Sequence, residues 1–159
     1  MLRFLFGDAK WVAASPAPVF GDKDPTLSGQ ILFENGILTS LCGMNVQDYL
    51  IFEMDLYGSK GRLRITHSGF DADLWKVGKG SYFSGYKELL PAKADFKLNK
   101  KQMMINAMTD LVKCVRTGKS PSCDGEDGVK ALELICAFHE SVRAGKRVEL
   151  PLKNRKVKI

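Results

Sequence analysis

The sequence lacks the features that would place a protein in a membrane or in an oxidising compartment. No apolar run in its 159 residues approaches the roughly 20 residues needed to cross a bilayer. The first residues, MLRFLFG, contain no small-residue cleavage site of a secretory signal. The four cysteines form no C-x-x-C pair and the two histidines lie far from metal-ligand spacing, which argues against structural zinc. We therefore expect a cytoplasmic protein with reduced thiols, no membrane partner and no metal site.

The length and composition are those of one folded domain. Hydrophobic residues make up 45% of the chain and charged residues 26%, which excludes an intrinsically disordered chain. A length of 159 residues lies within the usual range of roughly 100 to 200 residues for a single domain. We place this domain at residues 1–152 and interpret residues 153–159 as a basic tail.

The excess of positive charge is concentrated at the C-terminus. The chain has 24 Lys and Arg against 18 Asp and Glu, but four of the basic residues lie in the tail, so +6 falls to +2 without them. These four are Lys153, Arg155, Lys156 and Lys158. A nucleic-acid interface needs its cations on a folded face, so we expect no specific nucleic-acid partner. The alternative is a basic module whose sheet or tail holds a nucleic acid or another polyanion.

The beginning of the chain is expected to pass from a helix to a strand. Residues 1–7 are interpreted as the last turn of a helix that ends at Gly7, since glycine most easily adopts the left-handed conformation of a helix end. Residues 9–14 are predicted to form a short strand. Residues 15–25 contain several prolines and are predicted to form a loop.

A first hairpin is predicted around Asn35-Gly36. This dipeptide joins residues 27–34 to residues 37–44, and it best accepts the two positive φ angles of a type I′ turn. Apolar residues fall on both sets of alternate positions in these strands, so neither face is clearly polar. Helices of the same chain can cover one face. The other face is predicted to contact a second copy of the chain or another domain, which makes a homo-oligomer the expected assembly.

A second hairpin is predicted within residues 50–66, and its register can be deduced from the turn Gly58-Ser59-Lys60-Gly61. The predicted cross-strand pairs are Tyr57 with Arg62, Leu56 with Leu63, Asp55 with Arg64 and Met54 with Ile65. Leucine then meets leucine, and a carboxylate meets a guanidinium. Glu53 and Asp55 lie on one strand face, and Arg64 opposite Asp55 favours an ion-paired sheet surface over a catalytic carboxylate pair.

Two more strands are predicted at residues 71–77 and 81–89, followed by a polar connection over residues 91–100. Gly78-Lys79-Gly80 begins like a dinucleotide-binding fingerprint, but Phe83 stands at the third glycine position. We therefore interpret these glycines as part of a hairpin turn.

Two amphipathic helices are predicted after the strands. Apolar residues from Met104 to Val115 recur at helical spacing and favour a core-facing stripe on a helix that ends at Gly118. Asp124 is the predicted N-cap of the second helix, which ends at Gly145. The predicted buried stripe of this helix consists of Val129, Leu132, Ile135 and Cys136.

The order of these elements predicts an α+β fold. Residues 147–150 form a closing strand, and at least six strands come before any long helix. We expect a mostly antiparallel open sheet of about six or more strands, with helices packed on one face.

Motifs of common catalytic chemistries are missing from the sequence. It contains no G-x-x-x-x-G-K-[ST] phosphate loop, no G-x-S-x-G nucleophile motif and no H-E-x-x-H zinc helix. His139 lies on the expected buried stripe of the last helix, which favours a packed, hydrogen-bonded histidine over a proton-transfer role. We therefore assign no catalytic, cofactor-binding or metal-binding residue.

Three segments, in this order, resemble the C-terminal domain of the Gfo/Idh/MocA oxidoreductases, the family named for glucose-fructose oxidoreductase and inositol dehydrogenase. They are LRFLFG at residues 2–7, EMDLYGSKGRL at residues 53–63, and EDGVKALEL at residues 126–134 continuing to HESVRAGKRV at residues 139–148. The last segment is the most specific. The resemblance implies a mostly antiparallel open sheet with helices on one face, in agreement with the pattern of the residues.

The resemblance also implies what this chain does not contain. Family members have an N-terminal Rossmann domain that binds NAD or NADP, and they transfer hydride at a hydroxyl carbon of a sugar, polyol or related compound. This sequence contains neither the E-K-P motif, which holds the family's catalytic lysine, nor the D-x-x-x-H motif. We expect a chain that begins after the second motif, binds no cofactor alone, is inactive alone, and has the missing Rossmann domain as its partner.

In such enzymes the C-terminal domain supplies one wall of the substrate cleft and much of the oligomer interface. Polar residues near a strand end suit a wall that faces a hydroxylated substrate, and they indicate Tyr82, Tyr86 and Lys87 as substrate-binding residues. An exposed strand edge is the alternative interpretation of these three. For the whole chain, a non-catalytic dimeric scaffold that shares the fold is a further alternative.

Overall fold

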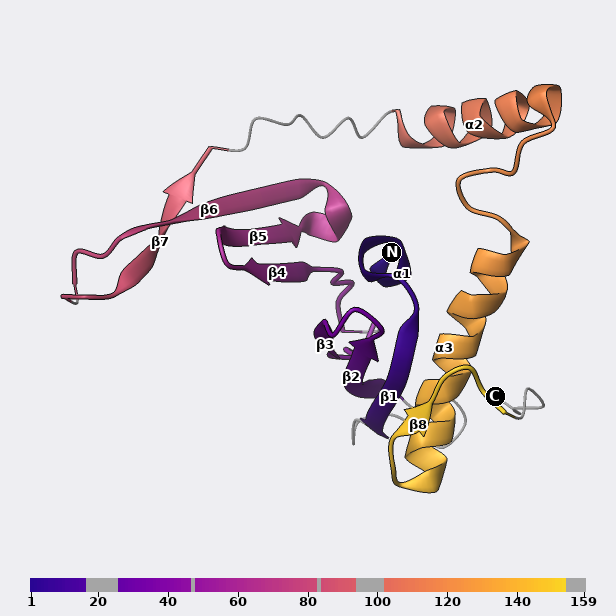
Figure 1. Ribbon diagram of the computed structural model, residues 1–159, viewed down its shortest axis with the longest axis horizontal. Coiled ribbons are helices and arrows are strands. Elements are labelled where there is room, and N and C mark those ends of the chain that lie inside the picture. Colours follow the sequence, from indigo (N-terminus) through magenta and orange to yellow (C-terminus); the bar gives the residue numbers. More distant parts are fainter. Residues whose placement is uncertain (17–25, 47, 83, 94–101, 154–159) are drawn as a thin grey trace. The chain divides into compact units, whose positions relative to one another are not determined.

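The computed structural model describes residues 1–16, 26–46, 48–82, 84–93 and 102–153, which belong to two compact units. The first unit takes in residues 1–48 and 118–159, and the second unit takes in residues 49–117. Their helices and strands are shown in Figure 1. The first unit contains α1 (Leu2–Phe6), β1 (Ala9–Pro16), β2 (Leu27–Phe33), β3 (Leu38–Leu41), α3 (Gly125–Ala144) and β8 (Val148–Glu149). The second contains β4 (Met54–Gly58), β5 (Gly61–Thr66), η1 (His67–Gly69), β6 (Asp71–Lys79), β7 (Lys87–Ala92) and α2 (Met103–Thr117).

The α+β class and the open antiparallel sheets are confirmed. The described strands form two four-stranded sheets, with the orders β3-β2-β1-β8 and β4-β5-β6-β7. Every strand pair in both sheets is antiparallel. Parts of three predictions lie outside the described residues: most of the loop at 15–25, most of the connection at 91–100, and all of the basic tail after residue 153.

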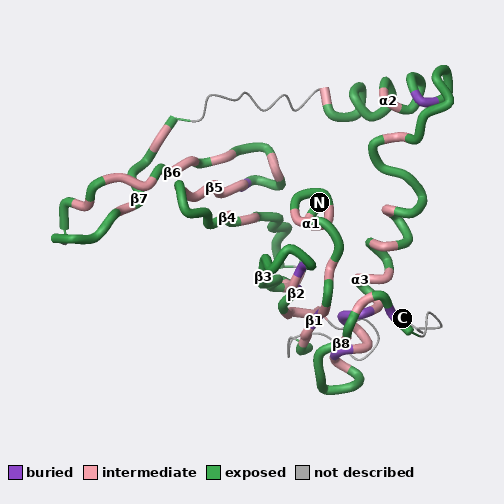
Figure 2. Tube along the Cα trace, in the orientation of Figure 1, coloured by how far each residue is buried: buried purple, intermediate pink, exposed green. Residues whose placement is uncertain are grey.

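The core of the first unit lies between its sheet and α3. Val12, Ile31 and Phe33 on the sheet are at most 1% exposed, and they pack with three residues of the C-terminal region. These three are Ala137, Phe138 and Leu152. Figure 2 shows buried positions on β1, β2 and α3. Burial of this apolar surface is the main stabilising contribution to the unit.

The predicted buried stripe of α3 is wrong at Val129, Leu132 and Ile135, whereas Cys136 does pack against the core. Val129, Leu132 and Ile135 are all more than half exposed, and Cys136 and His139 are half-buried. The helix instead turns Leu134, Ala137, Phe138 and Ser141 toward the sheet. Apolar residues lie on two sides of α3, so their spacing alone does not identify the side that packs on the sheet.

The C-terminal end of α2 and both caps of α3 agree with the sequence predictions. Asp124 accepts hydrogen bonds from the backbone N–H groups of Glu126 and Asp127, and the Asp127 carboxylate accepts a bond from the Asp124 N–H, which completes a capping box. Gly145 ends α3 in the left-handed conformation.

The core-facing stripe predicted for α2 is wrong. The apolar side chains of α2 from Met103 to Val115 are exposed, and Cys114 is the buried residue of this helix. The described helices do not have the length and hydropathy that crossing a bilayer requires.

The first hairpin forms at the predicted place with a different turn. Only Gly36 has a positive φ, of 84°, whereas a type I′ turn also needs one at Asn35. The Gly36 N–H donates to the Phe33 carbonyl, and the Phe33 N–H donates to the Ile37 carbonyl, which gives a three-residue loop. The Asn35 side chain accepts a hydrogen bond from the Ile37 N–H, and the Asn35 backbone keeps a negative φ. Gly36 is therefore the one residue of this turn in the left-handed region.

The second hairpin has the predicted register. All four predicted pairs occur, and Gly58 pairs with Gly61 as well, which leaves Ser59 and Lys60 as the turn. The strand begins at Met54, later than predicted. The next two strands cover Asp71–Lys79 and Lys87–Ala92, so Gly78 and Lys79 belong to β6 and the turn starts at Gly80. The strand predicted at residues 81–89 begins only at Lys87, and it continues through residues 91 and 92, which were predicted to be part of the connection. The closing strand is confirmed as Val148–Glu149, which pairs with β1.

Candidate functional site

The predicted substrate-binding residues lie at the end of the β6–β7 hairpin. Tyr82 and Tyr86 are in the turn, and Lys87 is the first residue of β7. The tyrosine side chains extend into solvent, with exposed fractions of 85% and 74%. The fold thus brings the three residues together at one end of a hairpin in the second unit, and their role in substrate binding stays a prediction.

This turn is held in shape by hydrogen bonds to Glu88. Its carboxylate accepts one bond from the Tyr82 N–H at 2.9 Å and one from the Ser81 hydroxyl at 3.3 Å. The Gly80 N–H donates to the Tyr86 carbonyl at 3.2 Å. A Cβ at position 80 would lie 2.6 Å from that carbonyl oxygen, so the close approach needs glycine. The two tyrosines are therefore presented from a closed turn.

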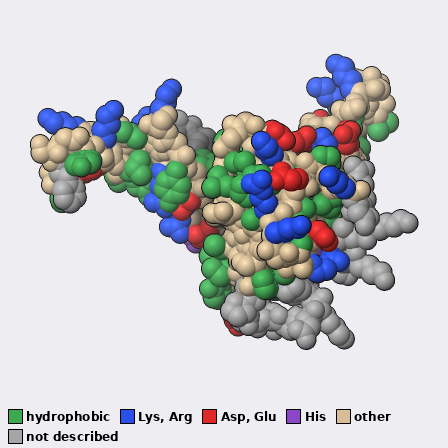
Figure 3. All heavy atoms as spheres, turned by 60° about the horizontal axis from the view of Figure 1, so that its bottom comes forward, with side chains coloured by type: hydrophobic (Ala, Val, Ile, Leu, Met, Phe, Trp, Pro, Cys, Tyr) green, Lys and Arg blue, Asp and Glu red, His purple; other side chains and the backbone are tan. Residues whose placement is uncertain are grey.

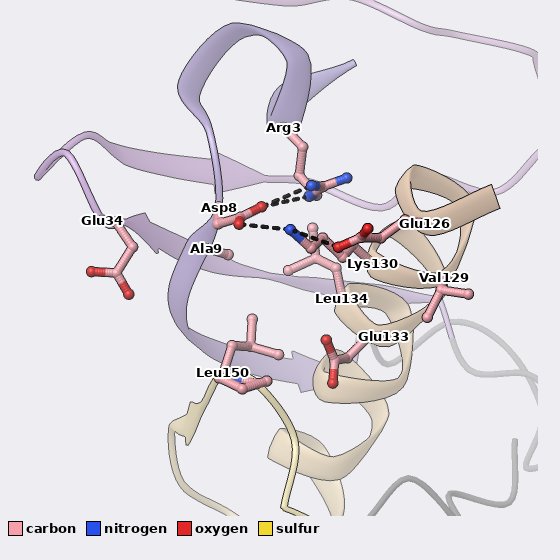
Figure 4. A pocket seen from close by; sticks show the side chains of 11 residues that line it. Arg3, Asp8, Ala9, Glu34, Glu126, Val129, Lys130, Glu133, Leu134 and Leu150 are labelled. Carbon is pink, nitrogen blue, oxygen red and sulfur yellow. Dashed lines mark hydrogen bonds and ion pairs between the residues drawn. The ribbon is translucent and has the colours of Figure 1, made fainter. Parts of the chain in front are cut away.

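A cleft of about 610 Å³ lies in the first unit, away from the residues that the sequence indicated. It is formed where the end of α1, the start of β1, the first turns of α3 and the segment after β8 come together (Figure 4). Apolar side chains of Ala9, Val129, Leu134, Leu150 and Pro151 line it, together with two cations and four carboxylates. The charged residues are Arg3, Asp8, Glu34, Glu126, Lys130 and Glu133.

A network of ion pairs crosses this cleft. The Arg3 guanidinium lies 2.7 Å from Asp8 Oδ1 and 3.1 Å from Asp127 Oδ1. The Lys130 ammonium lies 2.9 Å from Asp8 Oδ2 and 3.6 Å from Glu126 Oε1. In Figure 4 the side chains of Arg3 and Lys130 converge on Asp8. The network joins the end of α1 to the first turns of α3.

The pKa values of these groups shift toward their charged forms. The hydrogen bond from Arg3, followed by that from Lys130, holds the pKa of Asp8 below its ordinary value. The bond from the Asp124 N–H, followed by that from Arg3, lowers the pKa of Asp127. Because both cations of the cleft are paired with carboxylates, the cleft is better suited to fixing α1 on α3 than to acid–base chemistry or anion binding.

Only one pair of this network was recognisable from the sequence. Glu126 and Lys130 are four residues apart on a predicted helix, the spacing of an intrahelical ion pair. Asp8 and Lys130 are separated by 122 residues, so their contact depends on the tertiary fold.

One face of sheet β4-β5-β6-β7 carries charged and aromatic side chains. The Arg62 guanidinium lies 5.2 Å from the centre of the Tyr57 ring and 4.7 Å from that of Trp75. It also forms two hydrogen bonds to Asp55, of 2.7 and 2.9 Å. These bonds lower the pKa of Asp55 and raise that of Arg62. The face thus presents an arginine enclosed by two aromatic rings and a carboxylate.

The ion pairs on this face differ in detail from the prediction. Arg64 stands opposite Asp55 in the register but pairs with Glu53 at 2.6 Å, and Asp55 pairs with Arg62. Both contacts are therefore diagonal, which long arginine side chains allow. The interpretation of Glu53 and Asp55 as members of an ion-paired surface is confirmed.

The opposite face of this sheet is apolar over β4, β5 and the first part of β6. Residues paired across β4, β5 and β6 leave the same face, and on this side they include Met54, Leu56, Leu63, Ile65 and Leu74. All five are half-buried within the unit. In the described part of the chain, His, Cys, Asp and Glu side chains form no group of three that could hold a metal ion.

The chain matches one family over nearly its whole length. The family model described as "Oxidoreductase family, C-terminal alpha/beta domain", of the Gfo/Idh/MocA group, matches residues 1–150. No curated protein matches the chain in sequence.

Several solved structures share the fold. Levoglucosan dehydrogenase in complex with NADH and L-sorbose has a TM-score of 0.69 and 16% identity, over 94% of this chain and 47% of that one. An aldose-aldose oxidoreductase from Caulobacter crescentus, complexed with glycerol, has a TM-score of 0.68 and 22% identity, over 93% and 43%. An NAD-binding oxidoreductase from Klebsiella pneumoniae has a TM-score of 0.70 and 16% identity, over 96% and 48%. The chain spans less than half the length of each.

Proposed function

The chain belongs to the Gfo/Idh/MocA oxidoreductase family as its C-terminal alpha/beta domain, and from this we propose that it is the substrate-side, oligomer-forming domain of an NAD(P)-dependent oxidoreductase. The substrate class is a sugar, polyol or related hydroxy compound. The family match over residues 1–150 carries the proposal, together with the fact that the chain covers only 42–48% of the similar oxidoreductases.

The proposal divides the reaction between two domains. Hydride transfer needs a nicotinamide held against the substrate carbon, and an acid or base within hydrogen-bond reach of the substrate oxygen. The family's E-K-P and D-x-x-x-H motifs do not occur in this sequence, so the proposal gives no residue of this chain a catalytic or cofactor-binding role. NAD or NADP binds to the Rossmann domain of the complete enzyme, which is the partner of this chain.

This chain supplies one wall of the substrate cleft. Tyr82, Tyr86 and Lys87 are the proposed contacts, and the exposure of both tyrosines on a turn closed by Glu88 supports this role. Tyrosine hydroxyls both donate and accept hydrogen bonds, as the hydroxyl groups of a sugar or polyol do. A closed turn also limits the conformational entropy lost when a ligand binds.

The sequence predicts a contact with a second copy on one face of the first hairpin, which belongs to sheet β3-β2-β1-β8, and that contact stays a prediction. In the structure-based proposal the oligomer interface is instead the charged and aromatic face of sheet β4-β5-β6-β7. Tyr57, Arg62 and Trp75 are of the residue types that dominate the binding energy of protein interfaces. Tyr57 is 72% exposed, so a second copy has access to it.

The proposed compartment of the protein is the cytoplasm. Its four cysteines are all free thiols, which is usual for proteins in a reducing compartment.

Titration of the purified chain with NADH and NADPH, followed by nicotinamide fluorescence, tests the division of labour. We expect no saturable change with either nucleotide, because the nucleotide-binding domain is the partner. Saturable binding of one of them would overturn the proposal, since it would require a nucleotide site within this chain.

Sedimentation velocity across micromolar concentrations tests the interface. We expect a dimer that Tyr57→Ala and Arg62→Ala each weaken, whereas Lys60→Ala, in the exposed turn of the same hairpin, leaves the dimer intact. A compact monomer throughout, or an equal response of all three variants, would contradict this interface.

A further inference from the structure

Two lysines face each other at the end of the β6–β7 hairpin. Lys79 is the last residue of β6 and Lys87 is the first residue of β7, and they are paired across the two strands. Directly paired residues leave the same face of a sheet with their Cβ atoms about 5 Å apart. Both lysines are exposed, and neither has a carboxylate partner among the described residues.

The described carboxylates form no ion pair with either lysine. The next pair on the same face is Val77 with Leu89, and the nearest carboxylate on this face of β6 is Asp73, about 20 Å along the strand. Glu88 lies on the opposite face of β7, where its carboxylate accepts the two bonds from the turn. Since like charges directly opposite each other destabilise a strand pair, an anion bound between the two ammonium groups would stabilise this end of the hairpin.

The tyrosines of the same turn complement such an anion. Tyr82 and Tyr86 lie between the two lysines in the sequence, and their exposed rings offer an apolar face as well as a hydroxyl group. Figure 3 shows Lys and Arg side chains gathered at this end of the hairpin, at the left of the view. The turn therefore combines positive charge with groups that suit a hydroxylated ring.

We propose that Lys79 and Lys87 form an anion-binding site and that the substrate contacting this turn is a hydroxylated compound with a carboxylate or phosphate group. The identification of this ligand as the substrate rests on the proposed function. The anion site itself rests on the pairing of the two lysines. Lys79 thus joins Tyr82, Tyr86 and Lys87 as a proposed substrate contact. Its role is to select anionic over neutral compounds.

The test is an NMR titration of the isotope-labelled chain at constant ionic strength, with glucose 6-phosphate, glucuronate and glucose as probes. We expect saturable shifts of the backbone amides of Gly80 and Glu88 with an anionic probe and much weaker binding of glucose. The two anionic probes distinguish a phosphate from a carboxylate ligand. Lys79→Gln and Lys87→Gln should each weaken the binding of the anionic probe about tenfold.

Lys76→Gln is the matched control, because Lys76 is also exposed but points to the opposite face of β6. It should leave the binding unchanged. Equal effects of Lys76→Gln and Lys79→Gln would overturn the inference, because they would show that only the overall charge matters. Glutamine keeps most of the lysine stem, and the amide spectrum of each variant verifies that the hairpin is folded.

The remaining outcomes separate this inference from the proposed function. Equally tight binding of glucose would overturn the anion site but leave the substrate contact at Tyr82 and Tyr86. No saturable shift of the turn with any probe would overturn both the anion site and the contact site. Saturable NADH binding elsewhere on the chain would overturn the proposed function and leave the Lys79–Lys87 site standing.

Discussion

In the first unit α3 covers the sheet and almost completely buries Val12, Ile31 and Phe33, whereas only Thr66 and Cys114 are buried among the described residues of the second unit. The two sheets have equal numbers of strands and the same antiparallel pairing. The two sheets differ in how far their side chains are buried. The first sheet buries Val12, Ile31 and Phe33 in a core within its unit, and the second carries charged and aromatic side chains on one face.

The two units therefore have different expected roles: the first contributes most of the stability, and the second carries the proposed binding surfaces. The first unit is stabilised by apolar burial and by the ion pairs that join α1 to α3. The second depends on cross-strand pairs, each of which contributes less than 1 kcal/mol or so. Every surface that we propose for a ligand or a second copy lies on the second unit. The charged and aromatic face of its sheet is suited to that role, because Tyr57 on this face is 72% exposed and available for contacts outside the unit.

Truncation of the core should separate the two units most strongly. Phe33→Ala should lower the free energy of unfolding by about 3 to 5 kcal/mol, because Phe33 is fully buried against Phe6 and α3. Leu63→Ala, at a half-buried position of β5, should cost about 1 kcal/mol. Chemical denaturation of both variants measures these losses. Similar losses would contradict the contrast between a buried core and an open sheet.

A buried hydroxyl group should have the next largest effect. Ser141 is 1% exposed, and its hydroxyl accepts a bond from the Ala14 N–H at 2.9 Å and donates to the Lys146 carbonyl at 2.7 Å. Ser141→Ala leaves both backbone groups without this partner and should cost about 2 kcal/mol. Ser59→Ala, in the exposed turn of the second unit, is the matched control and should change stability by less than about 0.5 kcal/mol. Thermal unfolding measures the stability of both variants. Equal losses of stability would contradict a structural role of the Ser141 hydroxyl.

The smallest expected effect is on the acid dependence of stability. Asp8 in the first unit and Asp55 in the second both have a lowered pKa, caused first by Arg3 and by Arg62 respectively. A carboxylate whose pKa is lower in the folded state contributes stability above its unfolded pKa of about 3.9, and loses it as the pH falls toward the folded value. Asp8→Asn and Asp55→Asn should each flatten the loss of stability below about pH 4.

Both of these carboxylates are partly exposed, so each contribution at neutral pH should be about 0.5 kcal/mol. Urea denaturation between about pH 2 and 7 measures it, because this range extends well below the unfolded pKa of about 3.9. An unchanged pH profile in Asp8→Asn would show that the ion pairs around Asp8 do not form in solution.

The local structure of the chain could be predicted from the sequence to different degrees in different places. The register of β4 and β5 follows from two glycines and from matched side chains at a fixed spacing, and the caps of α3 follow from Asp124 and Gly145. The turn at Asn35-Gly36 was predicted with the wrong type, because the Asn35 side chain bonds to the backbone without a positive φ. Periodicity identified α3 as a helix but not the side that packs on the sheet.

The candidate site was predictable only in part. Tyr82, Tyr86 and Lys87 were indicated by residue type and by their position near a strand end, and they do lie together at the end of the β6–β7 hairpin. Lys79 was missed because its partner across the strands became known only with the register of β6 and β7. The Asp8–Lys130 contact joins residues 122 positions apart, so no local pattern contains it.

Hydrogen exchange as a function of protein concentration tests the contrast between the two units most directly. We predict that amides of β1, β2 and α3 are strongly protected at every concentration, because their core lies within one chain. Amides of β5 and β6 should exchange faster in dilute solution and become more protected as the concentration rises and a second copy covers their sheet. Equal protection in both sheets at all concentrations would contradict the account.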